Sequence, residues 1–260
     1  NILVIGDVVG RCGRDILAAK LSEIKTEYKI DFTVINGENA TTGNGINEKY
    51  ANLLFDAGAD VITLGNHSFD KKDIEHLLET DKRIIRPLNL SPDLAGDGVT
   101  LIEKDGVNYG VINLIGQVFM DKEATSPFEC LKKAVENLKR RYVNPVIIVD
   151  FHAEATSEKQ ALGYYLEGDI TALYGTHTHV QTNDARILSG KTGYITDVGM
   201  TGSEDSVIGL QKDIGVTRFT GGEKKSFKWG ETAPMINGAV FSVDENTAET
   251  KKIELISKKY

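Results

Sequence analysis

Residues 2–7 of the chain read ILVIGD, an apolar run followed by a glycine and an aspartate. A short continuous apolar run is typical of a strand that is buried on both faces, as in a parallel sheet. Later apolar runs occur at residues 32–35 (FTVI), 61–65 (VITLG), 146–149 (VIIV) and 170–175 (ITALYG). The polar side chains that follow the five runs are Asp7, Glu38-Asn39, Asn66-His67, His152 and His177-x-His179. Each predicted strand thus ends next to a side chain that can bind a metal.

This placement predicts one shared site. Ligands bind at the carboxyl ends of the strands in open α/β sheets, because the backbone leaves the sheet there and side chains can point into a common crevice. The candidate side chains span Asp7 to His179. A single site built from that span favours one domain over residues 1–260.

Helical patterns separate the predicted strands, which indicates an α/β fold. The predicted helices cover residues 14–28, 47–58, 70–78, 127–142 and 157–166. We expect Asn47 and Asp70 to be N-caps, and Ser157 with Gln160 to form a capping box. Ser157 is therefore interpreted as a cap rather than as a nucleophile.

The remaining segments are more typical of antiparallel strands. Residues 99–103 and 107–113 flank Asp105-Gly106, a strong hairpin signal. Residues 238–243 and 251–256 suggest a second antiparallel pair. Residues 201–234 between these regions show little periodicity and are rich in Gly, Lys, Asp and Ser, so we expect a lid or an insertion there.

Composition limits the classes of partner. The chain has 30 basic and 38 acidic side chains, a net charge of −8, and no basic tract, which disfavours nonspecific nucleic-acid binding. No apolar run approaches the roughly 18 residues of a membrane span, and no signal sequence opens the chain, so a cytoplasmic protein is expected. Cys12 and Cys130 are expected to be reduced thiols, one in a loop and one on a helix, and no chemical role is expected for Cys12.

The donors form a mixed nitrogen and oxygen set without cysteine. Such a set suits Mn, Fe, Co, Ni or catalytic Zn better than a structural zinc site. The seven candidate ligands are Asp7, Glu38, Asn39, Asn66, His152, His177 and His179. Seven donors are too many for one small cation that keeps an open position. Two metals sharing a carboxylate account for the number, and pairs of metals roughly 3.5–4 Å apart promote in-line displacement at phosphorus.

Each residue taken alone has a simpler interpretation. Asp7 could be a helix cap or turn former, Asn39 and Asn66 could be turn residues, and His152 could be a hydrogen-bonded core histidine. Asp197 fits either a turn or a hydrogen-bonding partner of a ligand histidine. Glu154 and Glu158 are compatible with solvated helix ends, and His76 with a surface or packing position. The metal hypothesis depends on the combination.

The combination resembles the calcineurin-like metallophosphoesterases. Their motifs are matched by Gly6-Asp7-Val8-Val9-Gly10, Asn36-Gly37-Glu38-Asn39, Gly65-Asn66-His67, Phe151-His152-Ala153-Glu154 and Gly175-Thr176-His177-Thr178-His179. Two features depart from the usual pattern. The first motif lacks a histidine two residues after Asp7, and Glu38 stands where an Asp bridges the metals.

With both departures, the sequence resembles the narrower group of YmdB-like phosphodiesterases. In that group, a residue at the position of Asn39 would replace the missing histidine. The resemblance covers nearly the whole chain. It implies a four-layer α/β/β/α sandwich of the metallophosphoesterase type and a di-iron or di-manganese site. It also implies hydrolysis of cyclic nucleotides, above all the 2′,3′-cyclic kind, in a protein that could self-associate.

The resemblance also implies a role for each ligand. Asp7, Glu38, Asn39 and His179 would hold one metal, and Glu38, Asn66, His152 and His177 the other. His67 would lie beside the substrate phosphate. We expect a metal-bridging hydroxide to attack phosphorus in line while His67 donates a proton to the departing ribose oxygen.

Other functions stay open at this point. The same metal core would serve 3′,5′-cyclic nucleotides, and a phosphomonoesterase or 5′-nucleotidase is the main rival among enzymes. A low-turnover nucleotide-binding regulatory protein is the alternative outside enzymes. The presence of His67 beside a full ligand set favours the enzyme, because a binding protein would not require a proton donor there.

Overall fold

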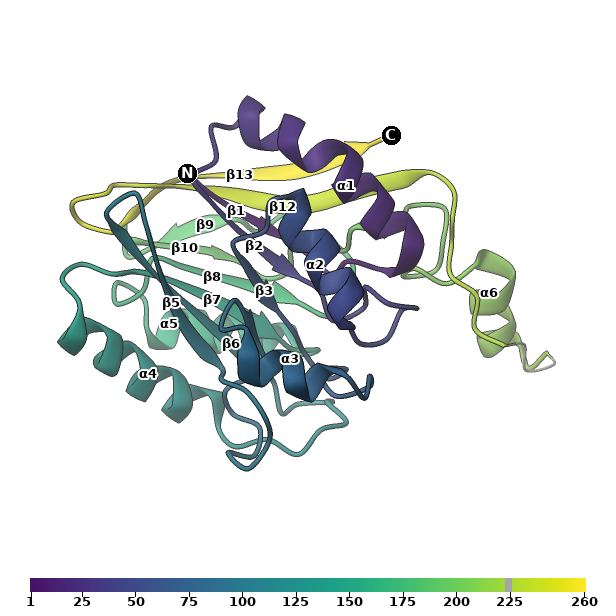
Figure 1. Ribbon diagram of the computed structural model, residues 1–260, viewed down its shortest axis with the longest axis horizontal. Coiled ribbons are helices and arrows are strands. Elements are labelled where there is room, and N and C mark those ends of the chain that lie inside the picture. The colour runs from purple at the N-terminus through teal and green to yellow at the C-terminus, as the bar shows by residue number, and fades with distance from the viewer. Residues whose placement is uncertain (223–225) are drawn as a thin grey trace.

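The computed structural model describes residues 1–222 and 226–260, and it shows two sheets packed face to face between outer helices (Figure 1). The helices are α1 (Gly10–Glu27), α2 (Glu48–Ala57), α3 (Ile74–Thr80), α4 (Pro127–Arg141), α5 (Thr156–Tyr165) and α6 (Lys212–Thr220). In the first sheet the order is β11-β12-β1-β2-β3-β4, with β13 paired to β12, and in the second it is β5-β6-β7-β8-β10-β9.

The first sheet comprises β1 (Ile2–Ile5), β2 (Phe32–Asn36), β3 (Val61–Thr63), β4 (Ile84–Ile85), β11 (Gly202–Ser203), β12 (Pro234–Val243) and β13 (Thr250–Lys259). The second comprises β5 (Val99–Lys104), β6 (Val107–Ile115), β7 (Val146–His152), β8 (Ala172–Thr176), β9 (Arg186–Leu188) and β10 (Thr192–Ile195). The strands β1 to β4 are parallel to one another, as are β6, β7, β8 and β10.

Alternating side chains of β1 create the layers. Leu3 and Ile5 join the core beneath α1, α2 and α3, whereas Ile2 and Val4 join the core between the two sheets. A third core fills the space between the second sheet and the helices α4 and α5. Because successive residues of a strand face opposite ways, a strand with both faces buried needs a continuous apolar run. The predicted α/β fold and four-layer α/β/β/α sandwich are confirmed.

The limits of α2 match their predicted signals. The Asn47 side chain accepts a hydrogen bond from the Tyr50 backbone N–H at 3.0 Å, and Gly58 ends the helix in the left-handed region at φ 118°. Glycine favours this conformation because it has no Cβ. The limits of α1 were predicted less well, since the helix begins at Gly10, so Cys12 lies on a helix and not in a loop.

Two predicted caps are wrong. Asp70 does not begin a helix, because α3 starts at Ile74 and the carboxylate of Asp70 instead contacts the His67 ring. Ser157 lies inside α5, whose N-cap is Ala155 and which has no side-chain cap. The Asp70 side chain has a partner outside the helix, and the helix near Ser157 begins one residue earlier. Local sequence alone does not decide between such alternatives.

Both predicted antiparallel pairs are confirmed. Strands β5 and β6 pair across the Asp105-Gly106 turn, where both residues have positive φ. Strands β12 and β13 pair along their length, and β12 also pairs antiparallel to β1. The last strands therefore complete the sheet that the first strand begins.

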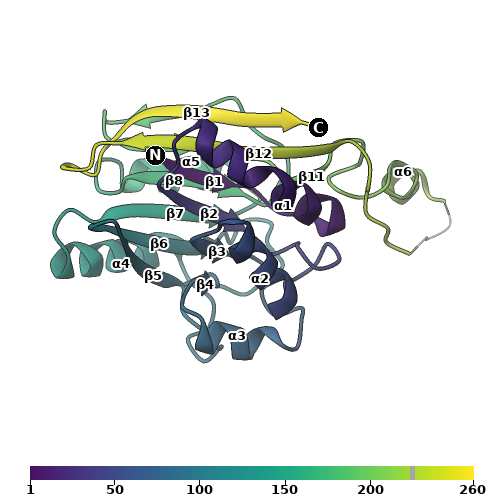
Figure 2. The same ribbon diagram turned by 45° about the horizontal axis from the view of Figure 1, so that its top comes forward.

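Residues 201–234 are less irregular than predicted. They contain β11 and α6, and α6 projects from the sandwich in both views (Figures 1 and 2). The helix buries only Ile214 and Gly215, so its sequence carries almost no amphipathic signal. Gly221, at φ 75°, ends the helix, and a glycine at this position is the sequence signal for its C-terminus. Residues 223–225 of the predicted lid lie outside the described residues, and closure over a substrate stays a prediction.

Among the described helices, none combines the length and the apolar character that crossing a membrane requires.

Candidate metal centre

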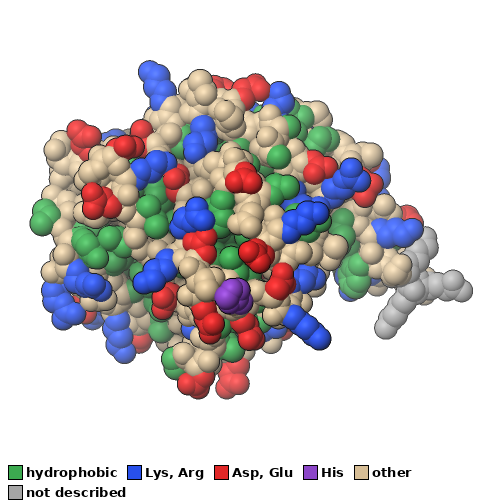
Figure 3. Space-filling view, in the orientation of Figure 1, with side chains coloured by type: hydrophobic (Ala, Val, Ile, Leu, Met, Phe, Trp, Pro, Cys, Tyr) green, Lys and Arg blue, Asp and Glu red, His purple; other side chains and the backbone are tan. Residues whose placement is uncertain are grey.

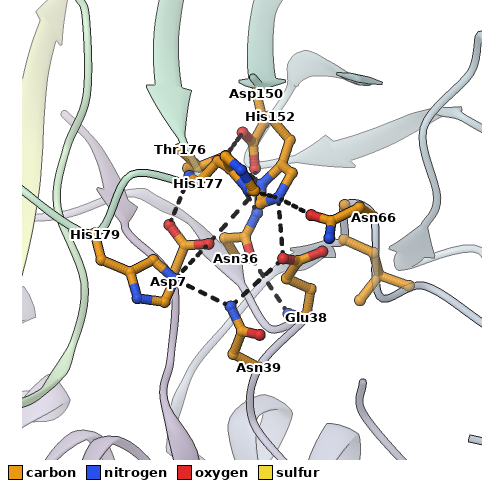
Figure 4. Close-up of polar contacts among 12 residues, drawn as sticks. Asp7, Asn36, Glu38, Asn39, Asn66, Asp150, His152, Thr176, His177 and His179 are labelled. Carbon is orange, nitrogen blue, oxygen red and sulfur yellow. Dashed lines mark hydrogen bonds and ion pairs between the residues drawn. The ribbon is translucent and has the colours of Figure 1, made fainter. Parts of the chain in front are cut away.

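The seven predicted metal ligands lie together at the carboxyl ends of five strands, where the two sheets meet (Figure 4). Asp7 follows β1, Glu38 and Asn39 follow β2, and Asn66 follows β3. His152 is the last residue of β7, and His177 and His179 follow β8. Asp7 and His152 are fully buried and Glu38 is 1% exposed. The fold thus brings residues 170 positions apart, Asp7 and His177, into one largely buried cluster.

Three polar atoms converge on the Nε2 atom of His152. The Glu38 carboxylate and the Asn66 amide oxygen each lie 2.9 Å away, and Nδ1 of His177 lies 3.0 Å away. Nε2 of His152 carries at most one proton and can donate a hydrogen bond to only one of these three atoms. The other two then have no hydrogen bond from this nitrogen. Donor atoms of Glu38, His152 and His177 lie within 4.8 Å of one another. Such convergence of lone pairs fits a cation at their centre.

A second group lies on the other side of Glu38. Nε2 of His179 is 3.7 Å from Oδ1 of Asp7 and 3.2 Å from the Asn39 amide nitrogen, which is itself 3.4 Å from Glu38. Oδ1 of Asp7 is buried without a hydrogen-bond partner among the described residues. A buried orphan carboxylate oxygen is costly unless a cation compensates it. Rotating the Asn39 amide by half a turn would present its oxygen to the same place.

Gly65 provides the space for this arrangement. A Cβ atom there would lie 2.2 Å from Oε2 of Glu38 and 2.3 Å from Cδ2 of His152. Any other residue would displace the two side chains that lie at the centre of the cluster. The orphan oxygen, the converging nitrogens and this close approach together show that the residues present fit a metal centre.

Burial and mutual interaction shift the pKa values of the ionisable groups in the cluster. Burial opposes protonation of His152, yet the nearby Glu38 and Asp7 carboxylates raise its pKa to about 9. Burial likewise opposes ionisation of Glu38, but the charge of His152 lowers the pKa of Glu38 to about 2. Burial and the charge of His152 lower the pKa of His177 to about 3. Without a metal, the proton on His152 therefore partly takes the place of a cation.

A hydrogen-bonded chain orients the His152 ring. Nδ1 of His152 lies 2.9 Å from the Thr176 hydroxyl, which donates to Asp150 at 2.7 Å. The Thr63 hydroxyl and the Asn36 amide also donate to Asp150. Burial raises the pKa of Asp150 to about 6 despite these hydrogen bonds. Asp150, Thr63 and Thr176 are polar residues inside otherwise apolar strands, and this is the signal of the network in the sequence.

The loop that carries His177 and His179 is held in an unusual conformation. Both histidines have positive φ, 98° and 65°. Such backbone costs energy and persists where surrounding contacts fix it. Asp197 accepts hydrogen bonds from the backbone and hydroxyl of Thr178, between the two histidines, and from buried Lys159 at 2.7 Å. Asp197 also accepts a hydrogen bond from the Gly199 backbone N–H at 2.8 Å, which confirms the turn interpretation, and its contacts with Thr178 fix the loop between the histidines.

His67 lies at the rim of the cluster. Its backbone N–H donates to Oε2 of Glu38 at 3.1 Å, and its Nδ1 lies 2.7 Å from the Asp70 carboxylate. Its side chain is 29% exposed. Since Asp70 engages Nδ1, Nε2 is the ring nitrogen left for a ligand. His76, in contrast, is an exposed residue of α3, as one of its two interpretations had it.

The two acidic residues that the sequence analysis assigned to helix ends differ from each other. Glu154 is half exposed and its carboxylate lies 3.3 Å from Nε2 of His177. Glu158 is buried and accepts hydrogen bonds from the backbone N–H groups of Gln117 and Val118, so its prediction as a solvated charge is wrong. Its contacts join residues 41 positions apart, which a helix-end pattern cannot reveal.

A cavity of about 510 Å³ opens over the cluster. Its lining includes Glu38, Asn39, His67, His177 and His179. It also includes Arg218, Phe227 and Trp229, which the sequence patterns do not single out. This volume suits a small organic ligand.

Comparison with known proteins assigns the family. The model of the family described as "YmdB-like protein" matches residues 3–256. The chain is 43% identical to the 2′,3′-cyclic-nucleotide 2′-phosphodiesterase of Bacillus subtilis, over 98% of this chain and 96% of the relative. A solved phosphatase from Mycoplasma pneumoniae superposes with a TM-score of 0.91 at 36% identity, covering 99% of this chain and 92% of that one.

A more distant structure shows the extent of the shared fold. A putative 5′-nucleotidase from Staphylococcus aureus superposes with a TM-score of 0.63 at 18% identity, over 98% of this chain and 53% of that one. The two chains therefore share the sandwich fold. Given the family match over almost its whole length, the chain belongs to the YmdB-like proteins.

Proposed function

We propose that this chain is a metal-dependent phosphodiesterase that hydrolyses 2′,3′-cyclic nucleotides at a dinuclear iron or manganese site. The observation that carries the proposal is the convergence of Glu38, Asn66 and His177 on Nε2 of His152, next to the orphan oxygen of Asp7. The name of the Bacillus subtilis relative supports a cyclic nucleotide as the substrate.

The donor set supports two cations of this kind. Glu38 lies between the groups around His152 and His179, so one carboxylate can serve both. Carboxylate, amide and imidazole donors suit iron and manganese. When bound, two such metals supply Lewis-acid activation of water and of the phosphoryl group.

His67 is the residue we assign to proton transfer. Hydrolysis adds water to phosphorus and breaks the bond from phosphorus to O2′, which leaves a nucleoside 3′-phosphate. The departing oxygen needs a proton, because an alkoxide is a poor leaving group. Because the Asp70 carboxylate engages Nδ1–H of His67, the doubly protonated ring would donate its other proton, on Nε2, to O2′ and become neutral.

The substrate is a small phosphodiester. The cavity of about 510 Å³ is of the size that takes a nucleotide, and the net charge of −8 opposes general attraction of a long polyanion.

The deciding experiment is an assay of the metal-loaded protein, with metal content measured, against three classes of substrate. These are 2′,3′-cyclic nucleotides, 3′,5′-cyclic nucleotides and 5′-monophosphates. We expect the highest kcat/KM for the 2′,3′-cyclic class, with the nucleoside 3′-phosphate as product. A preference for 5′-monophosphates, or no turnover of any class, would overturn the proposal.

A further inference from the structure

We propose that Phe227, together with Arg218 and Trp229, forms a nucleobase subsite beside the metal centre. The inference rests on the proposed function, because it names where the base of the nucleotide lies. It concerns residues that the metal cluster does not use.

The three side chains form one end of the cavity that opens over the metal centre. Arg218, Phe227 and Trp229 line the same space of about 510 Å³ as His67 and His177. The rings of Phe227 and Trp229 are within 13° of parallel, with centroids 6.5 Å apart. The guanidinium of Arg218 lies 4.5 Å from the centroid of Phe227. A phosphate at the metal centre and a planar group at this end can therefore share one cavity.

The exposure of Phe227 has no structural explanation within the sandwich. The ring is 58% exposed, although it borders a pocket lined by charged groups. The projecting region that includes α6, at the right of Figure 3, carries hydrophobic side chains among charged ones on the face shown. Exposed apolar surface beside a polar site often marks a ligand contact.

Backbone contacts connect the wall formed by Arg218, Phe227 and Trp229 to the metal centre. The carbonyl of Ile208 lies 2.9 Å from Nδ1 of His179. Two residues on, Leu210 forms a bridge with Trp229, and Gln211 donates to the Lys228 carbonyl at 2.9 Å. The position of the wall is thus set by the same segment that orients a predicted ligand.

Glycine fixes the position of the indole. A Cβ atom on Gly43, which has φ 78°, would lie 1.8 Å from two ring carbons of Trp229. The indole therefore lies directly against the backbone of a loop that also lines the cavity. A ring held this way loses little freedom when a ligand binds.

The chemistry of the wall matches a base. Aromatic rings and a guanidinium offer flat π and cationic surfaces, on which any nucleobase can stack without base-specific hydrogen bonds. We therefore expect tolerance of base identity and a clear preference for substrates that have a base over those that have none.

Kinetics of a Phe227→Ala variant test the subsite. The two substrates are 2′,3′-cyclic AMP and glycerol 1,2-cyclic phosphate, which has the cyclic diester but no base. We expect KM for 2′,3′-cyclic AMP to rise about 10-fold, as loss of a base–aromatic stack produces, with kcat little changed. The kcat/KM for glycerol 1,2-cyclic phosphate should stay at the wild-type value. Equal losses on both substrates, or on neither, would overturn the subsite.

Matched variants separate stacking from folding. Phe219 is 87% exposed and does not line the cavity, so Phe219→Ala should behave as wild type on both substrates. Phe227→Tyr should restore the wild-type KM, because it keeps the ring, whereas Phe227→Leu should resemble Phe227→Ala. A wild-type KM for Phe227→Leu would assign the effect to apolar bulk and overturn the proposal.

A binding measurement separates this inference from the proposed function. Trp229 is the single tryptophan of the chain, so its fluorescence reports on the wall alone. We expect adenosine 3′-monophosphate, but not glycerol 3-phosphate, to change this emission, with affinity about 10-fold weaker in Phe227→Ala. A change in Trp229 emission without turnover of cyclic nucleotides would overturn the proposed function but support the subsite. Turnover of cyclic nucleotides with no preference for a base, and with no change in Trp229 emission, would overturn the subsite but support the proposed function.

Discussion

Nδ1 of His152 lies 2.9 Å from the Thr176 hydroxyl, deep beneath the metal centre. The hydroxyl donates its proton to Asp150, so its oxygen can only accept from the ring. The contact keeps Nδ1 protonated and leaves Nε2 as the atom that can bind a metal. Partners of this kind tune the affinity of a metal site although they do not touch the metal.

Replacing Thr176 by Val should weaken metal binding. The change keeps the shape of the side chain and removes the acceptor for the His152 ring, so we expect metal affinity to fall about 10- to 100-fold. Metal titration followed by calorimetry measures the effect. The control is Thr33→Val, because the buried hydroxyl of Thr33 has no hydrogen-bond partner among the described residues. Equal affinity in the two variants would contradict an orienting role for Thr176.

Replacing Glu38 by Ala should remove both metals. Glu38 is the carboxylate that contacts both groups of ligands, and without it neither group is complete. Elemental analysis of the purified variant measures the occupancy. Glu23→Ala, an exposed position on α1, should retain the wild-type content. Full occupancy in the Glu38 variant would exclude a bridging role.

Replacing His67 by Ala should leave the metals bound and reduce turnover. Its ring contacts Asp70, and only its backbone contacts a predicted ligand. Loss of a general acid reduces kcat by about 10² to 10⁴-fold. The measurement is kcat together with metal content, and His76→Ala on the exposed side of α3 is the control. The assignment of His67 fails if the variant turns over cyclic nucleotides at the wild-type rate.

The metal-free protein should lose stability in alkaline solution. The folded-state pKa of His152, about 9, lies above its ordinary value of 6.5. The stabilisation is therefore fully present below pH 6.5 and is lost as the pH rises through about 9. We expect the free energy of unfolding to fall by about 1–3 kcal/mol over this window.

Thermal unfolding after removal of metal by a chelator tests this expectation. The pKa of Asp150, about 6, and that of His177, about 3, lie below this window. Burial also raises the pKa of Asp7, so a comparison with a His152 variant is what assigns the alkaline change to His152. A His152→Gln variant should show a flatter profile over the same range. A wild-type profile that is flat from pH 6.5 to 9 would show that His152 is not positively charged in the metal-free fold.

Much of the fold could be predicted from local patterns. The apolar run at residues 2–5 reflects a strand buried on both faces, and Asn47 and Gly58 mark a helix because their conformations are encoded locally. Asp70 and Ser157 are not the caps that the sequence predicts, because Asp70 has a partner outside the helix and α5 begins before Ser157. Only the packed structure shows that Asp70 contacts His67.

The sequence by itself determined which side chains end each strand, because an apolar run followed by a metal-binding residue is visible without coordinates. The tertiary structure alone decided that Glu38 lies between two groups of ligands, that Asp150 and Thr176 orient His152, and that Phe227 faces the same cavity. The reason is that these contacts join separate strands and loops, whose relative positions depend on how two sheets pack and not on any local pattern.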